Sequence, residues 1–166
     1  MWASSSAVSV AVLCAITAPA AASGWLGEAA DGEEGARVLK LGVEAGGATG
    51  RDRGAGALAG AIATFIYISP SLTWFGGQAD LLVDTNGDAD AGARWTIGPE
   101  LGHLFVGGDV SYIGERVAGE THHGIAIRPK LTIGIAAVYL RYARMSGDDG
   151  TSVEAGVQLK LPIKIW

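Results

Sequence analysis

The chain has 166 residues, which is enough for one domain with a sizeable core. Its formal net charge of −5 argues against a polyanionic partner such as nucleic acid. Hydrophobic residues make up 49% of the chain and the mean hydropathy is +0.30, yet no charge-free apolar run in its body reaches the ~20 residues of a membrane helix. The 26 glycines disfavour helices further, so the composition predicts an all-β protein.

The first 36 residues are predicted to lie outside the fold. Residues 1–23 are interpreted as a secretory signal peptide, with an apolar centre at 7–16 and small residues for cleavage at 18–23. A buried apolar N-terminal helix is the alternative. Cys14 is the only cysteine, so the mature chain is expected to lack disulfides and Cys-based metal or nucleophile sites. Residues 24–36 are Gly-rich and acidic, and are predicted to form a flexible periplasmic lead-in.

Residues 37–166 are predicted to form eight strands. The predicted strands are 37–47, 56–68, 72–83, 92–101, 104–114, 123–133, 135–145 and 152–165. The last strand has the clearest pattern, because apolar and polar residues alternate from Val153 to Ile165. Alternation is blurred in 56–68, 72–83 and 135–145. Pro99, Pro129 and Pro162 are assigned to bulges or strand ends.

The predicted connections alternate in character. Those at 49–54, 84–91, 115–122 and 146–150 are longer and charged, whereas those around 69–71, 102–103 and 134 are short and uncharged. Long loops on one side and tight turns on the other are typical of outer-membrane barrels, with the turns in the periplasm. Aromatic residues are predicted to form two interfacial belts. One belt contains Tyr67, Trp74, Phe75, Phe105 and Trp166, and the other contains Trp95, Tyr112 and Tyr142.

Charged residues share the polar register of these strands and are predicted to point into the barrel. The predicted interior set is Lys40, Glu44, Asp80, Arg94, Glu100, Asp109, Arg128, Lys130, Arg141, Glu154 and Lys160. An eight-stranded barrel is just wide enough for side chains to fill. Since buried charges persist only when they are paired, the near balance of six basic and five acidic residues predicts a packed ionic interior. A narrow polar channel is the alternative.

One predicted loop has the spacing of a calcium site. Asp84, Asn86, Asp88 and Asp90 place oxygen ligands at alternate positions, as calcium loops do. The alternative is a solvated hairpin loop that turns at Asn86-Gly87. No cofactor is expected.

The span from Arg37 to Trp166, whose last strand ends on Trp166, resembles the small eight-stranded outer-membrane barrels, the class of the OmpA membrane domain and OmpX. The resemblance implies an antiparallel up-and-down transmembrane β-barrel in the outer membrane of a diderm bacterium. It implies a monomer with a structural or surface-interaction role rather than an enzyme. The expected partners are outer-membrane lipid, lipopolysaccharide and the outer-membrane assembly machinery.

Two other functions fit parts of the sequence. A soluble periplasmic, lipocalin-like barrel would bind a small apolar ligand, with its apolar face turned inward and its charges outward. A lipid A-modifying hydrolase would need an activated hydroxyl. Ser111 could supply it, in a triad with His123 and either Glu115 or Glu120.

Overall fold

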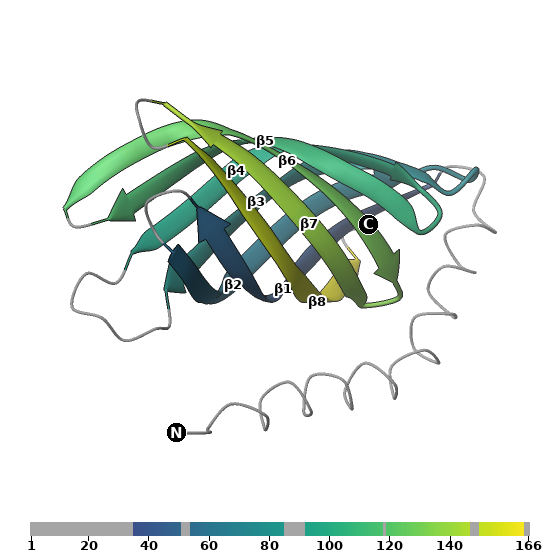
Figure 1. The fold of residues 1–166 in the computed structure, drawn as a ribbon. Helices are drawn as coiled ribbons and strands as arrows, with labels where there is room; N and C mark the ends of the chain where they lie inside the picture. Colours follow the sequence, from purple (N-terminus) through teal and green to yellow (C-terminus); the bar gives the residue numbers. More distant parts are fainter. Residues whose placement is uncertain (1–34, 51–53, 85–91, 118, 147–149, 165–166) are drawn as a thin grey trace, which may run out of the picture.

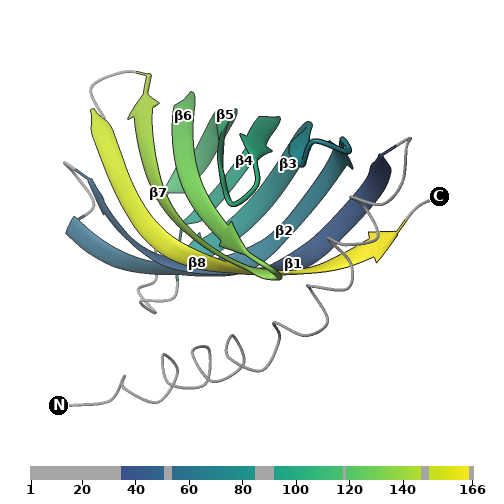
Figure 2. The same ribbon diagram turned by 90° about the vertical axis from the view of Figure 1, so that its right-hand side faces the viewer.

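The structure is a computed structural model that describes residues 35–50, 54–84, 92–117, 119–146 and 150–164. It contains eight antiparallel strands. These are β1 (Ala36–Gly50), β2 (Gly54–Ile68), β3 (Thr73–Asp84), β4 (Ala93–His103), β5 (Val106–Val117), β6 (Glu120–Ile133), β7 (Ala136–Met145) and β8 (Thr151–Lys164). Each strand pairs with the next, and β8 pairs with β1, so the sheet closes into an up-and-down barrel (Figures 1 and 2). The predicted fold class is confirmed.

The strands at one end of the barrel are joined by residues 69–72, 104–105 and 134–135, and we call this the short-turn end. Leu72, Leu104 and Gly134 have positive φ there, with values of 60°, 52° and 62°. Positive φ lets the chain reverse tightly, at little cost for glycine and with strain for leucine. No helix in the described part of the chain is long and apolar enough to cross a membrane.

The prediction of four long loops at the opposite end was wrong for two of them. Only residues 118–119 separate β5 from β6, and only residues 51–53 separate β1 from β2. Strand pairing in the β5–β6 hairpin continues to Val117 and Glu120, through most of the stretch predicted to be a loop. The reason lies in the register, because Glu115 follows Asp109 and Ser111 on the inward face and is 7% exposed. Charged residues were therefore not evidence for a loop at this position.

The two faces of the sheet differ sharply in polarity. In β7 the burial of side chains alternates strictly from Ala136 to Met145, as expected for a sheet with one enclosed face. The outward face is apolar, and Leu101, Ile125 and Ile133 are 69%, 62% and 67% exposed. The inward face carries the charged residues. This polarity is the reverse of a soluble barrel with an apolar interior.

The barrel interior is apolar at its ends and polar in its middle. At the short-turn end, Val38, Ile66, Ile68 and Trp74 form one buried cluster. Two further buried clusters lie at the opposite end. They consist of Ala48, Leu58 and Leu82, and of Ile113, Ala126, Ala143 and Met145. The sequence analysis assigned all apolar side chains to the outward face and all polar ones to the inward face, so it missed these inward apolar residues.

The aromatic residues only partly follow the predicted belts. Tyr67 and Phe75 pack with their ring centroids 5.4 Å apart, and Trp95 and Tyr112 pack at the same distance near the opposite end. Trp74 was assigned to a belt, but it points inward and is 9% exposed. Its position in β3 gives the same register as Gln78 and Asp80, so its ring closes the interior instead of facing outward. Trp166 lies outside the described residues.

Candidate functional site

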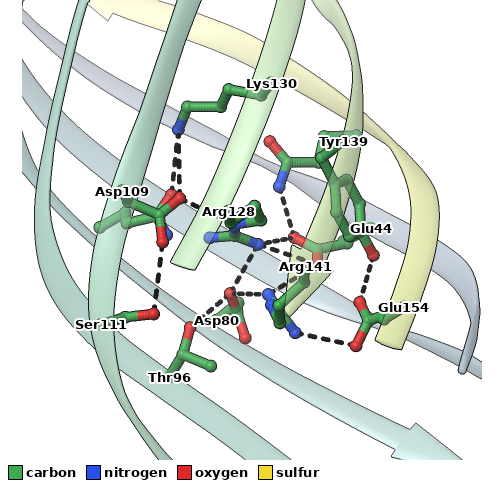
Figure 3. A network of polar contacts seen from close by, with 12 residues as sticks. Glu44, Asp80, Thr96, Asp109, Ser111, Arg128, Lys130, Tyr139, Arg141 and Glu154 are labelled. Carbon is green, nitrogen blue, oxygen red and sulfur yellow. Dashed lines mark hydrogen bonds and ion pairs between the residues drawn. The ribbon is translucent and has the colours of Figure 1, made fainter. Parts of the chain in front are cut away.

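The most organised feature of the described residues is a network of buried charges in the middle of the barrel (Figure 3). Its members come from strands that are far apart in sequence, because alternate residues of every strand point to the same enclosed space. They are Glu44 of β1, Asp80 of β3, Arg94 and Thr96 of β4, Asp109, Ser111 and Glu115 of β5, Arg128 and Lys130 of β6, Tyr139 and Arg141 of β7, and Glu154 and Gln158 of β8.

Arg128 forms ion pairs with three carboxylates. Its Nη1 lies 3.0 Å from Glu44 Oε2 and 3.0 Å from Asp80 Oδ2, and its Nε donates to Asp109 Oδ2 at 2.8 Å. The Arg128 side chain is fully buried. A buried guanidinium is stable only when carboxylates compensate its lost hydration, so these contacts are what allow a charge at this position.

Arg141 and Arg94 extend the network to the other strands. Arg141 Nη2 donates to Glu44 Oε1 at 3.0 Å and to Asp80 Oδ2 at 2.7 Å, and its Nη1 donates to Glu154 Oε2 at 3.1 Å. Arg94 Nη1 donates to the same Glu154 oxygen at 2.7 Å. Arg94 Nη2 also donates to Glu115 Oε1 at 3.0 Å. The three arginines therefore share carboxylates, and the charges form one connected cluster.

Neutral groups add hydrogen bonds to three of the carboxylates. The Tyr139 hydroxyl donates to Glu154 Oε1 at 2.5 Å, and Gln158 Nε2 donates to Glu44 Oε2 at 2.8 Å. Thr96 Oγ1 donates to Asp80 Oδ2 at 2.6 Å. The Tyr139 ring also lies against a guanidinium, with its centroid 5.4 Å from Arg128 Cζ. These contacts hold the carboxylates in position and exclude alternative rotamers.

Lys130, a member of this network, and two further lysines, Lys40 and Lys160, lie toward the short-turn end. Lys130 Nζ forms an ion pair with Glu100, lies 3.7 Å from Asp109 Oδ2 and donates to Gln78 Oε1 at 3.2 Å. Lys160 is buried, and Lys40 is half-buried. Together with the network, the described interior contains six basic and six acidic side chains. They are Lys40, Arg94, Arg128, Lys130, Arg141 and Lys160, and Glu44, Asp80, Glu100, Asp109, Glu115 and Glu154.

The structure thus brings ten of the eleven residues of the predicted interior set into buried positions, with Lys40 half-buried. Glu115 was missed, because it was assigned to a charged loop. It lies at an alternate position of the same strand as Asp109, Ser111 and Ile113. This spacing could have placed it on the inward face.

The calcium hypothesis falls mostly outside the described residues. Asn86, Asp88 and Asp90 lie beyond them, and Asp84 is the last residue of β3. Within the part of the chain that the structure describes, no group of three or more His, Cys, Asp and Glu side chains is arranged to hold a metal ion. The loop remains a sequence-based hypothesis.

The triad considered for a hydrolase is not assembled. Ser111 is buried inside the barrel, and its hydroxyl donates to Asp109 Oδ1 at 3.3 Å. His123 is exposed on the outward face and stacks on Tyr112, with ring centroids 5.6 Å apart. Because the sheet separates the two side chains, His123 cannot take a proton from Ser111. The network consists of paired charges of opposite sign.

No protein-family model matches the chain, and no curated protein matches it. Among solved structures, the chain is similar to one described as the crystal structure of Neisserial surface protein A (NspA), with a TM-score of 0.54 and 14% sequence identity. The match covers 75% of this chain and 97% of that one. Identity at this level establishes a likeness of fold alone. The chain therefore has the closed eight-stranded barrel fold of the small outer-membrane barrels, as the resemblance of its sequence implied.

Proposed function

We propose that the protein is a small integral barrel of the outer membrane of a diderm bacterium, with a structural or surface-interaction role. The observation that carries this proposal is the polarity of the two faces. Apolar side chains such as Leu101, Ile127 and Leu161 are 69%, 53% and 64% exposed on the outside, while the charges are buried inside. Lipid is the solvent that favours such a surface, and barrel closure leaves no unpaired sheet edge within it.

The ends of the outward face support the same proposal. At the short-turn end, the exposed outward positions include Arg37, Thr73 and His103, and at the opposite end they include Arg116 and Arg144. The outward positions between these ends carry no charged residue among those described. Polar and aromatic side chains at two levels, separated by an apolar band, match the two interfaces of a bilayer.

The buried network supports a barrel that does not conduct. Arg94, Arg128 and Arg141 are at most 1% exposed, and their carboxylate partners reach them from opposite sides of the interior. An ion entering the middle of the barrel would have to separate these pairs. We further propose that outer-membrane lipid and lipopolysaccharide surround the barrel, and that the outer-membrane assembly machinery inserts it. The protein would have a cleaved signal peptide and would be a monomer without enzymatic activity.

The lipocalin-like alternative is not supported, because it requires the opposite polarity. Its ligand would lie in an apolar interior, whereas the middle of this barrel is ionic. Its surface would be polar, but the exposed outward side chains of β6, such as Ile125, Ile127 and Leu131, are apolar.

Two measurements test the proposal. In purified outer membranes, the protein should run at different apparent masses in boiled and unboiled SDS samples, because closed barrels resist cold SDS. Recovery in the soluble periplasmic fraction would contradict the membrane location. In planar bilayers, the wild-type protein should show no stable conductance, and an Arg128→Ala, Arg141→Ala double variant should show more than an Arg144→Ala control. Steady conductance of the wild type would refute the closed interior.

A further inference from the structure

A cavity of about 90 Å³ lies inside the barrel at the short-turn end. Ile66, Ile68 and Trp74 form its apolar wall, and Leu104 and Phe105 of the β4–β5 turn lie at its margin. A single water needs roughly 10–15 Å³ of such space, so the cavity is large enough for a small organic molecule. Of the residues of the ionic network, only Lys130 also lines the cavity.

The charges in this cavity are unbalanced. Its lining contains three lysines, Lys40, Lys130 and Lys160, and Glu100 as the one carboxylate among the described residues. Glu100 is already paired with Lys130. The cavity therefore has more basic groups than acidic ones.

Two of these lysines form no ion pair with a carboxylate in the part of the chain that the structure describes. Lys160 is 6% exposed, and its Nζ donates only to the neutral Thr64 hydroxyl, at 3.4 Å. Lys40 makes no hydrogen bond or ion pair with a described residue. A buried ammonium group is costly unless an anion compensates it, so an anion that enters the cavity would stabilise the charged form of both lysines.

The apolar wall is held firmly in place. A β-carbon added at Gly102 or Gly107 would overlap the indole of Trp74, so glycine at these two positions lets the ring lie flat against the sheet. The indole Nε1 donates to the Leu104 carbonyl oxygen at 3.4 Å, and Lys130 Nζ lies 5.5 Å from the ring centroid. The wall is thus preorganised, which lowers the entropic cost of binding.

We propose that this cavity binds a small aliphatic monocarboxylate. The carboxylate would lie between Lys40 and Lys160, and the alkyl chain would pack against Ile66, Ile68 and Trp74. Two cations facing an apolar wall match a ligand with one anionic and one apolar end. The cavity volume limits the ligand to a few carbon atoms. Inorganic anions lack the apolar end, and neutral alcohols lack the charge.

The test is isothermal titration calorimetry of the folded full barrel in a detergent with a neutral headgroup. The probes are butyrate, butan-1-ol and inorganic phosphate. Butyrate should bind saturably in the millimolar range, and the other two should bind at least tenfold more weakly. Lys40→Met and Lys160→Met should each weaken butyrate binding by about ten- to a hundredfold, the worth of one charge-assisted hydrogen bond. Arg116→Met, on the outward face at the opposite end, should leave binding unchanged.

The comparison of the three probes uses the wild-type protein, so it does not depend on the variants folding. Equal binding of butan-1-ol would show that the lysines play no part, and equal binding of phosphate would show that the apolar wall plays none. Either result overturns the proposal, as does a lack of saturable butyrate binding. Unchanged affinity in both lysine variants, with their SDS mobility shift intact, would place any ligand elsewhere and also refute it.

Discussion

Arg128 offers the sharpest test of how the ionic network stabilises the barrel. Replacing Arg128 by Met keeps much of its length and removes the cation that contacts Glu44, Asp80 and Asp109. Arg141 still contacts Glu44 and Asp80, at 3.0 Å and 2.7 Å. Asp109 retains only Lys130, at 3.7 Å, and the Ser111 hydroxyl among its described polar contacts. The variant therefore leaves Asp109 as the least compensated buried charge.

The expected cost follows from the energetics of buried ion pairs. Removing one partner of such a pair destabilises a protein by about 3–5 kcal/mol, because the remaining charge stays buried. We expect Arg128→Met to lower the free energy of unfolding by this amount. Adding Asp109→Asn removes the stranded charge, so the double variant should lose less than the sum of the single losses, by at least ~1 kcal/mol.

The assay is urea unfolding of the barrel in lipid vesicles, with the folded fraction read from unboiled SDS samples and from tryptophan fluorescence. Arg144→Met is the matched control, since Arg144 is an exposed residue at the end of β7 and should change stability by no more than ~0.5 kcal/mol. The reasoning fails if Arg128→Met matches this control. It also fails if the losses of the two single variants simply add.

Two further predictions concern the outward face and the cavity wall. Ile127→Lys, in the middle of β6, should lower folding stability in lipid vesicles by about 2–4 kcal/mol, and Thr121→Lys at the end of that strand should cost at most ~1 kcal/mol. Equal costs would contradict a lipid-facing apolar band. Gly102→Ala should cost about 1–3 kcal/mol in urea unfolding, because its methyl group would overlap the Trp74 ring. Gly47→Ala, whose β-carbon would meet only one atom at 3.9 Å, should be tolerated, and similar losses in both would argue against the proposed packing of Trp74.

The sequence predicted the strands best where their two faces face different surroundings. In β8, apolar residues such as Val157 and Leu161 are exposed outward, and Glu154 and Gln158 are buried inward. Alternation was therefore complete and the strand was predicted within one residue at each end. In β2 the alternation was blurred for a physical reason. Its inward residues near the short-turn end, such as Ile66, are as apolar as its outward ones.

The partners within the network could not be predicted from the sequence. Arg128 and Glu44 are 84 residues apart, and Arg141 and Glu44 are 97 apart. The alternation of residues shows which face of the sheet a side chain lies on, but not its position along the barrel axis. That position depends on how the strands pair, so the sequence pattern alone does not show which charges meet. Glu115 was assigned to a loop for a related reason. A charged side chain suggests exposure to solvent, but its position in β5 turns Glu115 toward the barrel interior.

We expect the ionic network to help fix the register of the strands, because the alternation of apolar and polar residues cannot do so alone. A strand that slips by two residues keeps its apolar side chains outward and its polar ones inward, so the hydrophobic pattern does not oppose the slip. Such a slip moves each inward side chain by about 6.6 Å along the strand, and contacts of 2.8 Å to 3.0 Å around Arg128 would be lost. Buried ion pairs contribute little net stability over apolar packing, but they penalise mismatched neighbours strongly. The coupling expected between Arg128 and Asp109 is thus a measure of how firmly the paired strands β5 and β6 are held in one register.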